Sequence, residues 1–241
     1  MQIHIARSTE KLYQSVTAWI ASEIIAAVKE RGRCSIALSG GNTPKHVYQL
    51  LAEQPLSGTI PWQQVHFFWG DERMVPYNDD QNNAKMAFDS LLNFIDIPAE
   101  NIHRMPSQLE PAAAATQYDA LLHQFFSMAN EFSFDIVLLG MGDDGHTLSL
   151  FPGTEVLKEK EKWVIAYYVE KQQQFRMTLL PAIVNRCRAA AFIVSGLSKK
   201  ASFEAVTGTE KKPNQYPAQL IQPSLGELHW FIDAAVAENH L

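Results

Sequence analysis

Short apolar runs alternate with segments of helical periodicity along almost the whole chain. The runs predict strands at residues 34–38, 65–69, 134–139, 163–169 and 189–194, with a weakly alternating edge strand at residues 3–5 and a last strand that begins at residue 228. Apolar positions at helical spacing predict helices from Ser8 or Thr9 to Gly32, from Thr43 onward, at residues 79–92 and 111–126, from Ser198 onward, and at the end of residues 228–237. Continuous apolar runs are typical of parallel strands that are buried on both faces. The pattern therefore predicts a single α/β domain over residues 1–241, with a mostly parallel, doubly wound, Rossmann-like sheet and helices on both faces.

The densest group of reactive side chains follows the predicted strand at residues 134–139. The loop at residues 140–153 holds carboxylates, a histidine and hydroxyls between glycines. Loops that leave the carboxyl ends of parallel strands carry the sites of α/β proteins. His146 is therefore the first catalytic candidate, because histidine exchanges a proton readily near neutral pH. The alternative is a structural loop histidine that hydrogen-bonds to Asp144.

A glycine turn follows the strand at residues 34–38. It reads Ser39-Gly40-Gly41-Asn42-Thr43-Pro44. Thr43 suits a helix N-cap and Pro44 the first helical position, so the free N–H groups of a helix would face a ligand such as phosphate. The same sequence also fits a capped turn that binds nothing.

Cations recur where other predicted elements end or begin. Asp71 and Arg73 follow the strand at residues 65–69, and an arginine is a natural bidentate partner of phosphate. Arg176 follows a polar loop and is either a surface residue at a helix start or a cation at the same rim. Lys199 and Lys200 fall in the first turn of a helix capped by Ser198, where positive charge opposes the helix dipole unless an anion is nearby.

Composition limits the classes of partner. The formal charge is −6 and the basic residues are spread along the chain, so nucleic acid is not expected as a partner. Without a long apolar run or a signal peptide, the sequence predicts a cytoplasmic protein with no membrane contact. Cys34 and Cys187 are expected to be buried, reduced thiols.

Two other hydrolytic chemistries have weak support. The histidines show no metal-binding spacing, so neither a metal nor another cofactor is expected; they lie at positions 4, 46, 66, 103, 123, 146, 229 and 240. Ser149 lies three residues after His146, but it lacks the G-x-S-x-G context of a serine nucleophile.

Five motifs together resemble the 6-phosphogluconolactonase family over nearly the full chain. They are SGGNTP at 39–44, GDER at 70–73, GMGDDGHTLSLFPG at 140–153, FRMT at 175–178 and GLSK at 196–199. Leu148 and Gln173 depart from the usual pattern, in which a small residue and a proline are common. The wider superfamily includes glucosamine-6-phosphate deaminases, which carry a catalytic glutamate five positions after the histidine, where this chain has Phe151.

The resemblance implies hydrolysis of 6-phospho-D-glucono-1,5-lactone to 6-phospho-D-gluconate, the second step of the oxidative pentose phosphate pathway. His146 would activate water and then protonate the ring oxygen, with Asp144 orienting the imidazole. The implied substrate-binding residues are Ser39, Gly40, Gly41, Thr43, Asp71, Arg73, Gly142, Arg176 and Lys199. Backbone N–H groups between Gly142 and Gly145 would meet the charge on the carbonyl oxygen.

Some alternatives stay open at this point. Asp71 would replace His146 as the base if the histidine proved dispensable. A deaminase-like isomerase and a sugar-phosphate-binding module without turnover are the competing functions. The expected partner is a small-molecule substrate, and the chain is expected to be a monomer or a small homo-oligomer.

Overall fold

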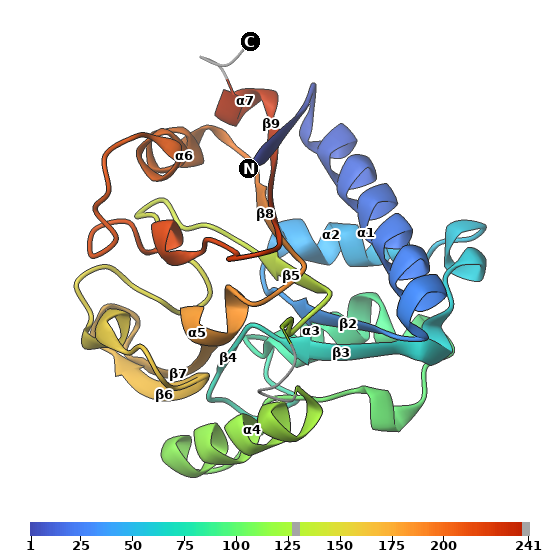
Figure 1. Cartoon of the computed structure of the whole chain (residues 1–241), viewed down its shortest axis with the longest axis horizontal. Helices are drawn as coiled ribbons and strands as arrows, with labels where there is room; N and C mark the ends of the chain where they lie inside the picture. Colours follow the sequence, from blue (N-terminus) through green and yellow to red (C-terminus); the bar gives the residue numbers. More distant parts are fainter. Residues whose placement is uncertain (127–130, 238–241) are drawn as a thin grey trace.

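The computed structural model describes residues 1–126 and 131–237, which are built around a central six-stranded sheet (Figure 1). Its strands are β1 Gln2–Ala6, β2 Cys34–Leu38, β3 Val65–Trp69, β5 Ile136–Leu139, β8 Ala189–Val194 and β9 Glu227–Asp233. Their order is β1-β9-β8-β5-β2-β3, and each neighbouring pair is parallel. The predicted parallel sheet is thus confirmed, with β1 at one edge.

Burial explains why these strands could be read from the sequence. Every residue of β2, β5 and β8 is buried, whereas the edge strand β1 is largely exposed and only weakly apolar. Both cysteines are buried free thiols, as predicted. A polar residue in a strand that is covered on both faces of the sheet needs a hydrogen-bond partner. The central strands are therefore apolar except for Ser35 of β2, whose hydroxyl donates to Asp135.

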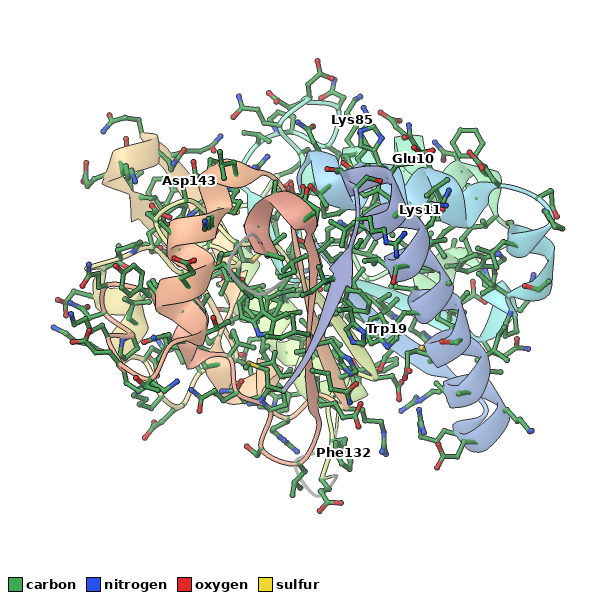
Figure 2. The ribbon with its side chains drawn as sticks, turned by 90° about the horizontal axis from the view of Figure 1, so that it is seen from above. Glu10, Lys11, Trp19, Lys85, Phe132 and Asp143 are labelled. Atoms are coloured by element: carbon green, nitrogen blue, oxygen red, sulfur yellow. The ribbon has the colours of Figure 1, made fainter. Side chains whose placement is uncertain are left out.

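Helices cover both faces of the sheet. They are α1 Thr9–Arg31, α2 Asn42–Ala52, α3 Asn83–Ser90, α4 Pro111–Phe125, α5 Pro181–Val184, α6 Lys200–Thr207 and α7 Ala234–Ala237. The 3₁₀ turns are η1 Leu56–Thr59, η2 Trp62–Gln64, η3 Leu92–Phe94, η4 Ala99–Asn101, η5 Glu155–Lys158, η6 Glu170–Gln172, η7 Leu197–Lys199 and η8 Pro217–Leu220. Figures 1 and 2 show α1 and α2 on one side of the sheet and α5 and α6 on the other.

The first helix begins and ends where its sequence predicts. The hydroxyl of Ser8 accepts a hydrogen bond from the N–H of Lys11, and Gly32 closes the helix in the left-handed conformation. Trp19 packs between α1 and the β1–β9 edge, where its ring lies 5.1 Å from His229 and 5.3 Å from Phe231 (Figure 2).

A second sheet of three antiparallel strands lies beside the first. It has the order β4-β7-β6, with β4 Asp71–Arg73, β7 Gln174–Leu179 and β6 Val164–Val169. Of the two alternatives for Arg176, the surface residue at a helix start is wrong, because Arg176 is buried within β7, paired with Arg73 of β4. Phe175, Met177 and Leu179 alternate with polar residues, which is the period of a strand.

Two predicted helix caps are also wrong. Helix α2 begins at Asn42, because Gly41 adopts a φ of 103° at the cap position, and Thr43 lies inside the helix with its hydroxyl 3.0 Å from the Ser195 hydroxyl. Ser198 lies in η7 and its hydroxyl donates to Asp143, so α6 begins only at Lys200.

The order in which successive strands are added to the sheet reverses between β2 and β5: β3 lies beyond β2 on one side, and β8 lies beyond β5 on the other. The connection after β2 runs through α2 on one face, and the connection after β5 runs through the small sheet and α5 on the other (Figure 1). Ligands of open α/β sheets bind in the crevice at the carboxyl ends of such a strand pair.

Candidate active site

A cleft of about 300 Å³ opens at this crevice. It is lined by Ser39, Gly40, Gly41, Asp71, Arg73, Asn83, Gly140, Met141, Gly142, His146, Leu148, Phe151, Gln172, Arg176 and Lys199. Most of the predicted site residues therefore lie around one cleft. The exceptions are Thr43, which bonds to Ser195 instead, and Asp144, which lies directly behind His146.

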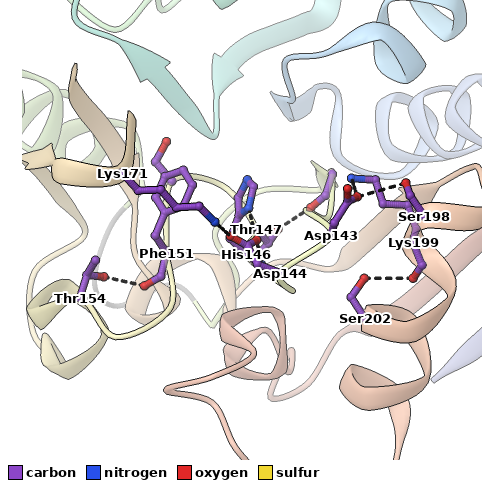
Figure 3. A network of polar contacts seen from close by, with 12 residues as sticks. Asp143, Asp144, His146, Thr147, Phe151, Thr154, Lys171, Ser198, Lys199 and Ser202 are labelled. Atoms are coloured by element: carbon purple, nitrogen blue, oxygen red, sulfur yellow. Dashed lines mark hydrogen bonds and ion pairs between the residues drawn. The ribbon is translucent and has the colours of Figure 1, made fainter. Parts of the chain in front are cut away.

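His146 and Asp144 form a hydrogen-bonded pair (Figure 3). The Nδ1 atom of His146 lies 2.6 Å from Oδ1 of Asp144, and the second carboxylate oxygen accepts a hydrogen bond of 2.8 Å from Lys171. Partial burial opposes ionisation of Asp144, but the hydrogen bonds from Lys171 and His146 outweigh it and hold the pKa of Asp144 well below its ordinary value. Because the ionised carboxylate accepts from Nδ1, the lone pair of the neutral imidazole is on Nε2.

Close packing fixes the histidine in this position. The imidazole stacks on the ring of Phe151 with 4.4 Å between centroids. A Cβ atom added at Gly142 would lie 2.0 Å from Nδ1 of His146, so only glycine fits beside the ring. The hydroxyl of Thr147 donates to the carbonyl of Gly140 and closes the base of the loop.

Two of the backbone N–H groups predicted to donate to the substrate's carbonyl oxygen form hydrogen bonds within the loop instead. The N–H of Gly142 donates to the carbonyl of His146, and the N–H of Gly145 donates to the carbonyl of Gly142. These bonds shape the loop that presents His146. These two N–H groups are therefore not free to stabilise an oxyanion, whereas the same role for the N–H groups of Asp143 and Asp144 stays a prediction.

Two arginines face each other at the far side of the cleft. Arg73 of β4 and Arg176 of β7 are cross-strand neighbours, and among the described residues their Nε atoms are buried without a hydrogen-bond partner. Burial, and then the charge of Arg73, lower the pKa of Arg176. Like charges on directly opposite residues destabilise a sheet. A bound anion would remove this repulsion.

Two acidic residues of β4, Asp71 and Glu72, offset part of the positive charge of these arginines. Asp71 lines the cleft and accepts a hydrogen bond of 2.6 Å from the hydroxyl of Ser149, which is fully buried and therefore not an exposed nucleophile. Glu72 is buried and accepts from the backbone N–H groups of Arg73, Asn83 and Ala84, although burial raises its pKa to about 7. Glu72 thus ties β4 to the start of α3.

Lys199, from η7, also lines the cleft. Its Nζ atom lies 2.5 Å from Oδ1 of Asp143, which also accepts from Ser198 (Figure 3). Lys199 lines the cleft and Lys200 does not.

Sequence reasoning missed Lys171, Gln172 and Asn83. Gln172 and Asn83 line the cleft, and Lys171 reaches Asp144 from the turn between β6 and β7. In the sequence, residues 170–174 form the polar loop before Arg176, and nothing in that pattern indicated a role in the site. The signal that could have revealed them is the antiparallel pairing of β4, β6 and β7, which brings that turn to the rim.

The described residues contain no group of three or more metal-ligating side chains placed to hold an ion, and His240 lies outside them. Across the same residues, the helices are all too short or too polar to span a bilayer.

A doubly wound sheet with a histidine–aspartate pair and several cations at its strand ends is typical of an α/β protein that binds a small anion. Comparisons with known proteins give the particular family. The sequence model described as "Glucosamine-6-phosphate isomerases/6-phosphogluconolactonase" matches residues 7–230. The chain is 40% identical to a 6-phosphogluconolactonase of Synechocystis over 99% of this chain and 98% of that protein. It is 33% identical to a 6-phosphogluconolactonase of Haemophilus influenzae over 90% of this chain and 91% of that protein.

Solved structures agree with this result. A 6-phosphogluconolactonase from Trypanosoma cruzi matches with a TM-score of 0.86 and 27% identity over 99% of this chain and 96% of that chain. A monomeric glucosamine-6-phosphate deaminase has the same fold, with a TM-score of 0.84 at 18% identity over 99% of each chain. This chain belongs to the glucosamine-6-phosphate isomerase/6-phosphogluconolactonase family.

Proposed function

We propose that this chain hydrolyses 6-phospho-D-glucono-1,5-lactone to 6-phospho-D-gluconate in the oxidative pentose phosphate pathway. The observation that carries the proposal is the His146–Asp144 pair at one end of a cleft whose other walls hold three cations. A phosphorylated lactone needs both features, a base for water and a cradle for the phosphate. The relatives named 6-phosphogluconolactonase support the same reaction.

In the proposed mechanism, Nε2 of His146 takes a proton from water as the water oxygen bonds to the lactone carbonyl carbon. The bond between that carbon and the ring oxygen then breaks, and the imidazolium returns the proton to the ring oxygen. Asp144 keeps the hydrogen of the neutral ring on Nδ1 and stabilises the imidazolium. Acid–base catalysis of this kind contributes about 10²- to 10⁴-fold in rate.

Arg73, Arg176 and Lys199 hold the phosphate in this proposal. Arginines suit phosphate because their N–H groups form paired bonds to its oxygens. Ser39, Gly40 and Gly41 complete the cradle at the start of α2, where free N–H groups favour an anion. Thr43 supports this turn through Ser195 rather than by touching substrate.

The competing deaminase function has less support. Phe151 occupies the position where the resemblance places a catalytic glutamate, and its ring stacks on His146.

We further propose that residues 1–241 act as one cytoplasmic lactonase domain, as a monomer or small homo-oligomer that does not bind nucleic acid.

A coupled assay tests the activity. Glucose-6-phosphate dehydrogenase generates the lactone, and an excess of 6-phosphogluconate dehydrogenase reports its opening as NADPH. We expect a burst above the spontaneous rate, unchanged by EDTA, and no ammonia release from glucosamine 6-phosphate. No acceleration at micromolar protein would contradict the proposal. Ammonia release would favour the deaminase, and binding without turnover a sugar-phosphate-binding module.

A further inference from the structure

Lys171 contacts the catalytic pair from outside the catalytic loop. It belongs to η6, the turn between β6 and β7, and its Nζ atom lies 2.8 Å from Oδ2 of Asp144. The other carboxylate oxygen lies 2.6 Å from Nδ1 of His146. The two oxygens of Asp144 therefore have different partners, and Figure 3 shows Lys171 and His146 on the same carboxylate.

The turn that carries Lys171 has a defined shape. Gln173 adopts a φ of 50°, and both its backbone N–H and its side-chain amide donate to the carbonyl of Glu170. The same segment brings Gln172 to the cleft and leads into β7, which carries Arg176. The Lys171–Asp144 bond thus joins the small sheet, with its share of the cleft, to the loop that presents the histidine.

We propose that Lys171 is a positioning residue for the lactonase reaction: it orients the Asp144 carboxylate toward His146 and holds the β6–β7 turn against the catalytic loop. This inference rests on the proposed function. Without Lys171, Asp144 can rotate away from the imidazole, and Gln172 loses its anchor at the cleft.

The charge of Lys171 has a second, measurable effect. The lysine side chain is 67% exposed, so its field at the imidazole is screened by water. The Asp144 carboxylate separates this charge from the imidazole, so in a water-like medium its effect on a titration is small. Removing a positive charge favours the imidazolium, so the acid limb of the kcat profile should move to higher pH. The other charged groups around the histidine are Asp71, Arg73, Asp143, Arg176 and Lys199.

The chain offers a matched control. Lys158 forms a similar ion pair of 2.8 Å with Glu155, and its side chain is 71% exposed, but it lies outside the cleft. Lys171→Met and Lys158→Met therefore each remove a lysine of similar exposure from an ion pair of the same length, and only the first touches the catalytic pair. Lys171→Arg keeps the charge and the reach to Asp144.

The experiment measures kcat and KM for the lactone from pH 5 to pH 9 in these variants and the wild type. For Lys171→Met we expect kcat to fall about 10-fold, the lower end of the range for residues that orient the ligands of a metal, with KM within about two-fold. The acid limb should move to slightly higher pH. Lys171→Arg should restore both values, and Lys158→Met should match the wild type.

Two results would overturn the inference. One is a Lys171→Met enzyme with the kcat and pH profile of the wild type; the other is an equal loss in Lys158→Met. If the wild type itself does not open the lactone, the proposed function fails instead. The ¹⁵N NMR shifts of the His146 ring then test the contact alone, because Lys171→Met should change them and Lys158→Met should not.

Discussion

At the scale of single residues, the ionised carboxylate of Asp144 decides which nitrogen of His146 can act as a base. Its hydrogen bond to Nδ1 leaves Nε2 to accept a proton from water. The low pKa of Asp144 keeps this arrangement across the pH range in which histidine titrates.

Asp144→Asn tests this assignment. The amide has no charge to stabilise an imidazolium and can favour the opposite tautomer, so kcat should fall at least about 100-fold. Asp143→Asn is the control, because Asp143 contacts Lys199 and Ser198 rather than the histidine. Steady-state kinetics should show the loss of kcat only in the first variant, and equal kcat values in both would contradict the assignment.

Arg73 should contribute to binding more than to turnover. Arg73→Ala removes one of two facing guanidinium groups, and a hydrogen bond to a charged group contributes about 1.5 to 3 kcal/mol. KM and the Kd of 6-phosphogluconate should therefore rise about 10- to 100-fold, with kcat little changed. Calorimetric titration with the product measures the Kd; an unchanged value would place the phosphate elsewhere.

Gly142 should not tolerate a side chain, whereas Gly140 should. An added Cβ at Gly142 meets the His146 ring at 2.0 Å, but one at Gly140 has its nearest neighbour, the Ser39 hydroxyl, at 3.7 Å. Gly142→Ala should lose most of its activity and keep its circular dichroism spectrum, and Gly140→Ala should keep both. Full activity in Gly142→Ala would show that the histidine position is not critical.

At the scale of elements, a pair of histidines couples stability to pH. The Nδ1 atom of His66, in β3, lies 3.3 Å from Nε2 of His103, and both rings pack against Phe68 or Phe125. Burial, and then the neighbouring His66, lower the pKa of His103 from 6.5 to about 4. Because the pKa of His103 is lower in the folded than in the unfolded protein, its contribution to the unfolding free energy depends on pH. This contribution is fully present above about pH 6.5 and is lost as the pH falls toward 4.

Chemical denaturation at pH 7 and pH 5 measures this coupling. We expect the wild type to lose roughly 1 kcal/mol or more of unfolding free energy over that interval through this pair. His103→Phe keeps the ring packing and should lose less, whereas the surface variant His46→Gln should behave as the wild type. Equal pH dependence in all three proteins would exclude the pair as the source.

The sequence predicts the elements of the central sheet because their information is local. Buried parallel strands are apolar runs, and α1 carries its own cap and its terminal glycine. The small sheet is different, because β4 is short and charged and pairs with β7, which lies about a hundred residues later. Its partner, rather than its own composition, makes β4 a strand, so the sequence did not reveal that Arg176 lies in the paired strand β7.

At the scale of the whole molecule, the parallel sheet explains why distant motifs meet. Segments after β2, β3, β5 and β8 emerge at one edge, so the sequence order of strands and glycine turns is enough to expect Ser39, Arg73, His146 and Lys199 around one cleft. The supporting contacts of Glu72 and Lys171 could not be predicted in this way. They depend on how the small sheet packs against the large one.

The central claim is that His146 is the base of a lactone hydrolase. The most direct test measures, for His146→Ala beside the wild type, both kcat for lactone opening and the Kd of 6-phosphogluconate. We predict that kcat falls at least about 100-fold, while the Kd stays within about two-fold, because Arg73, Arg176 and Lys199 still hold the phosphate. A variant with wild-type kcat would contradict this account and would point to Asp71 as the base.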